Sequence, residues 1–261
     1  GDVGVGAREP AGSGSSTRGL FSGGNPSGSG HNVIQYVTIA SAGTTADFGD
    51  LTVARGSAAG ASSSTRSLTA CGNTGTGNSD VIDYVTIAST GNATDFGDAS
   101  AAKNYPSGLA SATRAVIGGG NSGSNLDVME YVTIGSTGDV TDFGNLVAAT
   151  QQLSACAGST RGLFGGGIPS SASNVIQYIT IASTGNTTDF GDLTAARYAL
   201  TATANKTQGL FLNGREAGDA VAINTIESVT IASTGNATDF GDGVEGRRFS
   251  AATSSAHGGI A

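Results

Sequence analysis

Two aspartates three residues apart recur along the chain in the string Asp-Phe-Gly-Asp, at 95–98, 189–192 and 239–242. Paired carboxylates suit Ca²⁺, which takes oxygen ligands in flexible sets. The alternative is a turn in which the aspartate oxygens accept backbone N–H bonds. Because the dense Asp/Asn spacing of calcium loops is missing, the sequence favours the turn and predicts neither a metal site nor a cofactor.

A second recurring group is an arginine that follows a threonine. Such cations could form a ring that binds an anion or a carboxylate. They could instead pair with an aspartate of the Asp-Phe-Gly-Asp string, which we favour because a residue that recurs in every unit usually has a structural role. The arginines predicted to be structural in this way are Arg18, Arg66, Arg114 and Arg161.

Residue types that carry catalysis are scarce. The two histidines, His31 and His257, have no cluster of cysteines or carboxylates beside them, so no zinc site is predicted. Neither stands in a catalytic motif, and the sequence contains no strained nucleophile turn. Cys71 and Cys156 occupy different places in their repeats, which predicts two unpaired buried thiols. We therefore expect that the protein is not an enzyme.

The elements that position these residues are repeats. The string Tyr-Val-Thr-Ile-Ala-Ser begins at Tyr36 and returns as close variants at Tyr84, Tyr131 and Tyr178, with Ser228 in the fifth copy. Asp-Phe-Gly follows in each copy, with its phenylalanines spaced 48, 47, 47 and 50 residues apart. These phenylalanines are predicted structural positions: Phe48, Phe96, Phe143, Phe190 and Phe240.

Each copy predicts four short strands. Around Tyr178, a β-branched run at 175–182 and a returning run at 187–193 flank a Gly-Asn pair, which suits a tight hairpin. No apolar period of 3.6 residues is sustained, so a helical solenoid is excluded. We expect one all-β domain over 1–261, a β-propeller of four-stranded blades. A β-solenoid is the second choice, because its coils usually repeat at a much shorter period.

The repeats predict five blades of about 47 residues and a remainder. Residues 243–261 are expected to form either a partial repeat or a strand that closes the ring by replacing a poorly formed first strand at 4–12. Five blades are favoured, and six are the alternative. The predicted repeats cover 1–50, 51–98, 99–145, 146–192 and 193–242.

The pattern resembles kelch repeats over nearly the whole chain. A kelch blade carries a glycine doublet after its second strand, a tyrosine in the third and an aromatic residue in the fourth, often followed by a basic residue. Here Phe replaces the usual Trp, and Cys71-Gly72 stands at the second doublet. The string IASTGNATDFGD is also similar to glycine-rich kelch-like proteins of tailed phages, notably those of marine cyanobacteria. The doublets are Gly23-Gly24, Gly118-Gly119 and Gly165-Gly166, and the basic residues are Arg55, Lys103, Arg197 and Arg247.

Composition excludes several classes of partner. The formal net charge of −8 argues against nucleic acid or an anionic membrane surface as the main partner. No apolar run approaches the roughly 18 residues of a membrane span, so no membrane insertion is expected. Charged residues make up only 12% and 43 of the 261 residues are glycine, which is close to a disordered composition. The repeats instead assign these glycines to hairpin turns and close strand packing.

The loops that escape the repetition predict a binding surface. Loops between second and third strands, and segments between blades, share one face of a propeller and differ widely among the copies, whereas the turns of the opposite face are nearly constant. Neutral drift of unconstrained loops is the alternative reading. The predicted binding residues are Asn25, His31, Asn73, Asn78, Lys103, Tyr105, Asn121, Arg215, Glu216 and Asp219.

The function expected from these features is non-catalytic. The resemblance implies a structural or appendage protein of a phage virion, such as a fibre, knob or decoration, present in many copies on the particle. Its expected partners are other virion proteins or a receptor or glycan on the host surface. The alternative is a secreted or surface carbohydrate-binding propeller with an extracellular location, and an enzyme with its site in the central channel is the least favoured.

Overall fold

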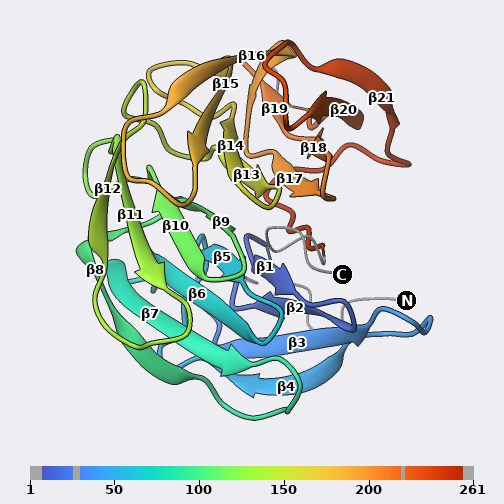
Figure 1. The fold of residues 1–261 in the computed structure, drawn as a ribbon. Coiled ribbons are helices and arrows are strands. Elements are labelled where there is room, and N and C mark those ends of the chain that lie inside the picture. Colours follow the sequence, from blue (N-terminus) through green and yellow to red (C-terminus); the bar gives the residue numbers. More distant parts are fainter. Residues whose placement is uncertain (1–7, 26–29, 219–220, 255–261) are drawn as a thin grey trace.

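The structure is a computed structural model that describes residues 8–25, 30–218 and 221–254. The described part of the chain contains strands and no helix, and it forms five antiparallel sheets, each built on four strands, arranged as a five-bladed β-propeller (Figure 1). One sheet has a short fifth strand at its edge. The expected all-β propeller with five blades is confirmed. No helix that could cross a membrane occurs among these residues.

Each blade takes its four strands in chain order, with the first strand innermost. Blade 1 contains β1 (Ala11–Gly14), β2 (Arg18–Ser22), β3 (Val33–Thr38) and β4 (Ala46–Asp50). Blade 2 contains β5 (Ala59–Ser62), β6 (Arg66–Asn73), β7 (Asn78–Thr86) and β8 (Thr94–Lys103). Blade 3 contains β9 (Ser107–Ala110), β10 (Arg114–Gly118), β11 (Val128–Thr133) and β12 (Thr141–Asn145).

The last two blades follow the same order with one addition. Blade 4 contains β13 (Ser154–Ala157), β14 (Arg161–Gly165), β15 (Ser173–Thr180) and β16 (Thr188–Tyr198). Blade 5 contains β17 (Thr201–Ala204), β18 (Gln208–Leu212), β20 (Thr225–Thr230) and β21 (Thr238–Asp242). The short strand β19 (Arg215–Glu216) leaves blade 5 and pairs with the end of β16, so it joins two neighbouring blades.

The Asp-Phe-Gly string lies in the fourth strand of each blade and not in a turn, which corrects the expectation. Its glycine sits at a register shift between the third and fourth strands that recurs in all five blades. In blade 3 this residue is Gly144, with φ +135°, and a Cβ on it would lie 2.4 Å from the carbonyl oxygen of Gly185 in the next blade. The motif recurs because only glycine fits both the backbone conformation and the close contact.

The phenylalanine of the string fills the space between blades. In blade 1, Phe48 packs edge-on against Tyr36, with ring centroids 5.8 Å apart and planes at 83°. The same pair recurs in blades 2, 3 and 4. Phe48, Phe96, Phe143 and Phe190 are only 1–2% exposed, whereas Phe240 in blade 5 is 58% exposed. The last blade therefore lacks the cover that a following blade gives to the others.

The recurring arginines do not pair with aspartates, so that prediction is wrong. Each guanidinium lies over the tyrosine of its own blade, at 4.2–4.7 Å from the ring centroid. Each also donates a hydrogen bond of 2.8–2.9 Å to an isoleucine carbonyl oxygen in the next blade. A planar guanidinium can stack on an aromatic ring with its face and donate a hydrogen bond from its edge at the same time. An ion pair with an aspartate at the surface would not make the stacking contact.

A second contact between blades is a buried ion pair. Arg55, which follows the fourth strand of blade 1, lies 2.9 Å from Asp83 on β7, and both side chains are 0% exposed. Lys103 and Glu130 form the equivalent pair between blades 2 and 3. Between blades 4 and 5 the pair is Arg197 and Glu227. These are three of the four basic residues that the kelch resemblance singled out, and their role is to join blades.

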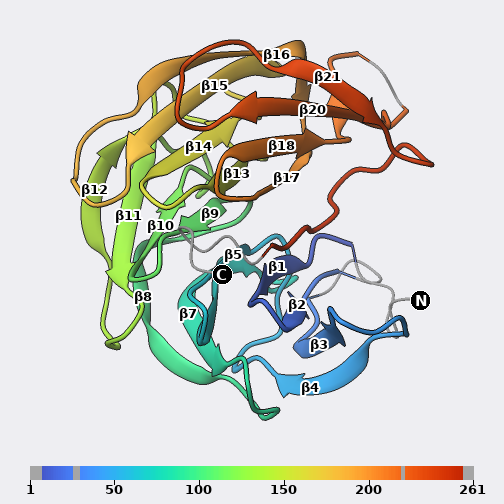
Figure 2. The ribbon, with the colours of Figure 1, turned by 45° about the vertical axis from the view of Figure 1, so that its right-hand side comes forward.

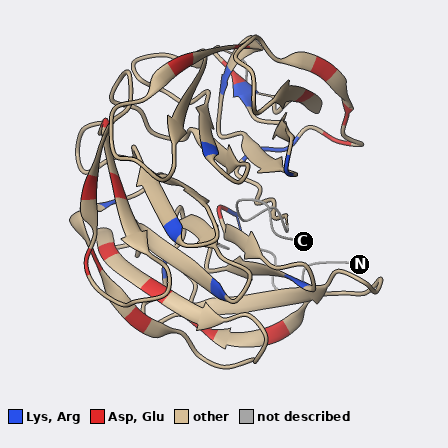
Figure 3. Ribbon diagram, in the orientation of Figure 1, with Lys and Arg blue, Asp and Glu red and all other residues tan. Residues whose placement is uncertain are grey.

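Acidic and basic residues lie at different distances from the propeller axis. Acidic residues lie mainly along the outer strands of the blades, and basic residues lie further in (Figure 3). The outer rim therefore carries most of the net negative charge.

Candidate binding site

The segments that connect one blade to the next meet around the propeller axis. One residue of each segment donates its backbone N–H to the carbonyl oxygen of the equivalent residue in the preceding segment, at 2.9–3.3 Å, and the six bonds close on themselves. All six residues have φ between 52° and 61°, the left-handed region that few non-glycine residues adopt. We call this set the inner ring: Glu9, Ser57, Tyr105, Gln152, Ala199 and Phe249.

The C-terminal segment supplies the sixth member of the inner ring. Phe249 accepts a hydrogen bond of 3.1 Å from Glu9 and donates one of 2.9 Å to Ala199, so it bridges the first and last segments. The first strand of blade 1 is present as β1, so the C-terminal segment runs beside it and does not replace it (Figure 2). The ring thus has six places around five complete blades.

The six inner-ring residues share a backbone conformation but carry different side chains. They are an acid, a hydroxyl, a phenol, an amide, a methyl and a phenyl group. A strained backbone position that is kept in every repeat while its side chain changes is a place where function can vary on a fixed scaffold.

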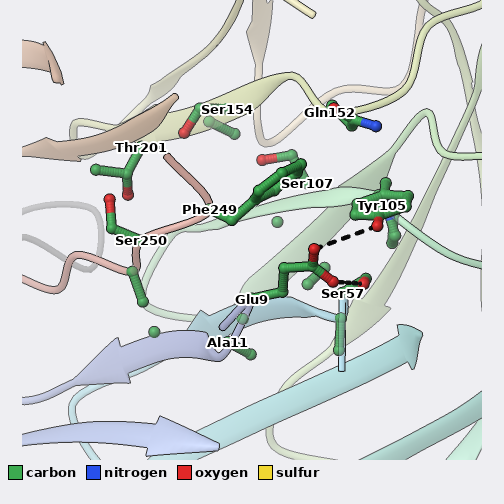
Figure 4. A pocket seen from close by; sticks show the side chains of 18 of the residues that line it. Glu9, Ala11, Ser57, Tyr105, Ser107, Gln152, Ser154, Thr201, Phe249 and Ser250 are labelled. Carbon is green, nitrogen blue, oxygen red and sulfur yellow. Dashed lines mark hydrogen bonds between the residues drawn. The ribbon is translucent and has the colours of Figure 1, made fainter. Parts of the chain in front are cut away.

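Glu9 is the polar centre of this surface (Figure 4). Its carboxylate accepts hydrogen bonds from the Ser57 hydroxyl, from Asn25 Nδ2 at 2.8 Å and from the Tyr105 hydroxyl at 3.3 Å. Burial raises the pKa of Tyr105, so the phenol stays protonated and can act as the donor at neutral pH. The three partners come from three different segments and hold the carboxylate in one orientation.

The inner ring surrounds a hollow of about 130 Å³ at the axis. Tyr105 and Phe249 form an aromatic pair on one side, with ring centroids 5.8 Å apart and planes at 37°. Gln152 Oε1 and Ser250 Oγ line the same hollow, are buried, and have no hydrogen-bond partner among the described residues. Buried polar atoms are normally paired, so these two are ready to bind a ligand or water. The volume is below the roughly 300 Å³ of pockets that enclose a whole ligand, so the hollow would admit a single ring or side chain.

The channel below the hollow has a different chemistry. The first strands of the blades and the segment 252–254 line it with glycine, alanine, serine and threonine and with Cys156, around a space of about 90 Å³. Gly12 and Gly60 have no room for a Cβ, because it would lie 2.4 and 2.2 Å from a carbonyl oxygen of the neighbouring segment. No cluster of three or more metal-ligating side chains occurs in the described ranges. Small uncharged side chains at this radius serve close packing.

Several predicted binding residues hold the loops of this face together. Asn73 and Asn121 pair by backbone bonds with Gly56 and Asn104, on the segments between blades. The Asn78 side chain donates a bond of 2.9 Å to the carbonyl oxygen of Asn121 in the next loop. These asparagines therefore support the face, and their side chains are already engaged.

The other predicted residues are spread over the same face. Asn25 contacts Glu9 directly, whereas His31 contributes its backbone to the packing against Arg55. Arg215 lies 5.9 Å from the ring centroid of Tyr198 and begins β19, with Glu216 beside it. The prediction for Asp219 falls outside the described residues.

Lys103 is the predicted binding residue that the structure corrects. Its side chain is 1% exposed and bound to Glu130 between blades 2 and 3. A loop-like segment in the sequence suggested an accessible lysine, but β8 extends to this residue and carries it inward. Lys103 therefore joins two blades and cannot meet a partner at the surface.

Tyr105 is the predicted residue that the structure places at the centre of the face, and Glu9, Gln152 and Phe249 were missed. All four lie at one aligned position, 47–50 residues apart from repeat to repeat. The sequence holds a signal for these residues, because aligned repeats show a different side chain at this one place in each copy, but the variability of the segments alone does not single it out.

The two cysteines are free and buried, as expected. Burial raises the pKa of Cys71 and of Cys156 to about 12. Thiolates are the reactive form, so neither side chain is a nucleophile near neutral pH. Cys71 has φ +61° at the place where Gly23, Gly119 and Gly166 have φ of 65–68° in blades 1, 3 and 4, which explains why glycine recurs there.

The fold and the inner ring define the class of protein as a five-bladed β-propeller with a hollow at its axis. A scan against protein-family models and a search of curated proteins each gave no match.

Proposed function

We propose that the protein is a non-catalytic recognition protein that binds its partner with the face around the inner ring. The observation that carries this proposal is the ring itself, which holds six different side chains on one repeated backbone conformation. A purely structural ring would be expected to keep one side chain type, as the arginine and tyrosine positions do in blades 1 to 4.

The setting we propose is a virion of a tailed phage, where the chain serves as a fibre, knob or decoration. Support comes from the kelch-like repeat and from the similarity of the IASTGNATDFGD string to phage proteins. The acidic rim and the net charge of −8 disfavour nucleic acid as the partner. Many copies on one particle would turn weak polar contacts into firm attachment. The partner would be another virion protein or a receptor on the host surface.

The experiment that tests this setting is quantitative mass spectrometry of purified phage particles that encode the chain. The proposal expects the protein at several copies per particle. Its absence from the particles would refute the virion setting and leave the recognition role to be tested by binding.

A carbohydrate ligand is the second candidate, and one observation favours it. The aromatic pair Tyr105–Phe249 lies beside the Glu9 carboxylate and the unpartnered Gln152 Oε1. A sugar ring offers an apolar face for stacking and hydroxyls that both donate and accept hydrogen bonds. Binding of the full chain to an array of defined oligosaccharides, with and without Tyr105→Ala, tests this candidate. Signals that do not change with the substitution would count against a sugar at the axis.

A further inference from the structure

The inner ring has six residues, but only five complete blades surround it. The sixth residue, Phe249, lies at the gap between blade 5 and blade 1. Among the described residues, only the segment 247–254 lies there, entering from the rim to the axis beside β1 (Figures 1 and 2). No described second strand pairs with this segment, although it aligns with the first strands of the blades. We call this gap the slot.

Both walls of the slot expose apolar side chains that are buried elsewhere. Phe240 on blade 5 is 58% exposed, against 1–2% for its four equivalents. Ile39 on blade 1 is 52% exposed, whereas its equivalents Ile87, Ile134, Ile181 and Ile231 are 1–3% exposed. At each of the four interfaces between blades, these two faces are covered by a neighbouring blade. At the slot, each wall lacks the neighbour that would cover it.

The backbone of blade 5 at the slot also lacks the contacts that the next blade makes with blades 1 to 4. A Cβ on Gly241 would meet nothing within 4 Å, whereas on Gly49, Gly97, Gly144 or Gly191 it would meet the turn of the next blade at 2.3–2.5 Å. In blades 1 to 4, the backbone N–H that follows this glycine donates a 3.0 Å bond to an asparagine or aspartate of that turn. The Asp242 N–H is the equivalent donor in blade 5.

The charge of Arg247 indicates which residue type the missing neighbour would place opposite it. Its equivalents Arg55, Lys103 and Arg197 have side chains 0–1% exposed and paired with an acid on the third strand of the following blade. Arg247 is 67% exposed and contacts only its neighbour Glu245 among the described ion pairs. At the remaining described interface, Thr150 stands in place of the basic residue and Gln177 in place of the acid. A basic residue in one blade thus goes with an acid in the next, and a neutral residue goes with a neutral one.

We infer that the slot binds a set of three β-strands of this same repeat, equivalent to the second, third and fourth strands of a blade, with an acid immediately before its tyrosine. The acid would pair with Arg247 and accept the Val244 N–H, as Asp83 does with Arg55 and the Thr52 N–H. The hairpin turn of the set would cover Gly241 and accept the Asp242 N–H.

Blade 5 lacks the stacked arginine of the other blades, so the ion pair with Arg247 would be its main specific contact with the bound strands. Gln208 and Ser228 stand where the other blades have the stacked arginine and tyrosine. The guanidinium bond to the next blade is therefore not available here. Affinity would depend on apolar contact with Phe240 and Ile39 and, for selectivity, on the buried pair with Arg247.

The probe is a peptide of residues 112–145, which contains β10, β11 and β12 and carries Glu130 before Tyr131. It is added to the full chain, and binding is measured by calorimetry and by hydrogen exchange at Asp242. We expect saturable binding with slower exchange of the Asp242 amide. The peptide variant Glu130→Gln should bind roughly a hundredfold more weakly, because it leaves Arg247 buried without a countercharge.

The matched control copies the neutral interface of the chain. The variant Arg247→Thr should bind the Glu130→Gln peptide better than it binds the unchanged peptide, because Thr150 and Gln177 hold these two places between blades 3 and 4. If all four combinations bind equally, the charge pairing is refuted.

Two further results would overturn the inference. The peptide could aggregate by itself, so the same segment is also joined after Ala261 through a Gly/Ser linker, and unchanged exchange at Asp242 in both forms would refute the docking. Protection of the Asp242 amide that rises with the concentration of the unmodified chain alone would show that a second copy of the chain, and not a separate set of three strands, fills the slot.

Discussion

The hydroxyl of Tyr105 donates a hydrogen bond of 3.3 Å to Oε1 of Glu9, a residue 96 positions earlier in the chain. The two meet because each occupies the same place in its own repeat, at the strained residue of the segment between blades. The repeat fixes the backbone of this place, and only the side chain differs from one repeat to the next. The interfaces between blades and the side chains at the axis can therefore be tested separately.

The stacked arginines should stabilise the blade interfaces. Arg114→Ala removes the contact with the Tyr131 ring and the bond to the Ile181 carbonyl oxygen, and we expect a loss of about 1–3 kcal/mol in the free energy of unfolding. Arg114→Lys should recover only part of it, since lysine lacks the planar fork. Urea unfolding measures the change. Gln208→Ala, at the equivalent place in blade 5, should cost less than about 0.5 kcal/mol.

The glycine of Asp-Phe-Gly should be required for two separable reasons. Gly144→Ala imposes a strained φ and places a Cβ 2.4 Å from the Gly185 carbonyl oxygen, whereas Gly241→Ala imposes the strained φ alone. Thermal unfolding should show a clearly larger loss for Gly144→Ala, with about 1–2 kcal/mol expected for Gly241→Ala. Equal losses would mean that backbone strain alone explains the motif.

The buried ion pair between blades 2 and 3 should behave as a unit. Glu130→Gln alone leaves Lys103 buried and unpaired, and we expect a loss of about 3–5 kcal/mol. The double variant Lys103→Thr with Glu130→Gln introduces the two neutral residue types that stand at these places between blades 3 and 4, and its stability should be closer to that of the unmodified chain. Chemical denaturation of all four combinations gives the coupling energy, and a value near zero would contradict the pairing.

The buried thiols predict a pH dependence. Both cysteines have a pKa of about 12 in the fold, raised from 9.0, so the folded chain keeps two protons that the unfolded chain releases. Stability from this source is fully present below pH 9 and is lost as the pH rises from 9 toward 12. Unfolding measured between pH 7.5 and 10.5 should show a steeper decline for the unmodified chain than for a Cys71→Ser, Cys156→Ser variant. Native thiols should also resist labelling at pH 8.

Periodicity predicted the fold because each repeat is one blade, and the strings around Tyr36 and Phe48 mark its third and fourth strands. Patterns within a repeat did not predict contacts between repeats. The arginines bind isoleucine carbonyl oxygens of the next blade, and a backbone acceptor leaves no trace in residue type. Lys103 lies at the start of a segment between blades that varies among the repeats, which predicted an exposed residue, although β8 continues to that position.

The candidate site was predicted only in part for the same reason. Variable segments between blades were identified, and Tyr105 among them, but the inner ring depends on φ values and backbone bonds that the sequence does not display. Glu9 and Phe249 come together only because the two ends of the described chain meet at the axis.

The central claim is that the side chains of the inner ring, on a constant backbone, carry recognition. Binding of the full chain to whole cells of the host of the proposed phage, measured for Tyr105→Ala beside the unmodified protein, tests it most directly. Thr184→Ala, in an exposed turn on the opposite face, is the control. We predict that Tyr105→Ala lowers cell binding at least about tenfold while the melting temperature changes little, and that Thr184→Ala has no effect. Unchanged binding by a folded Tyr105→Ala protein would contradict the account.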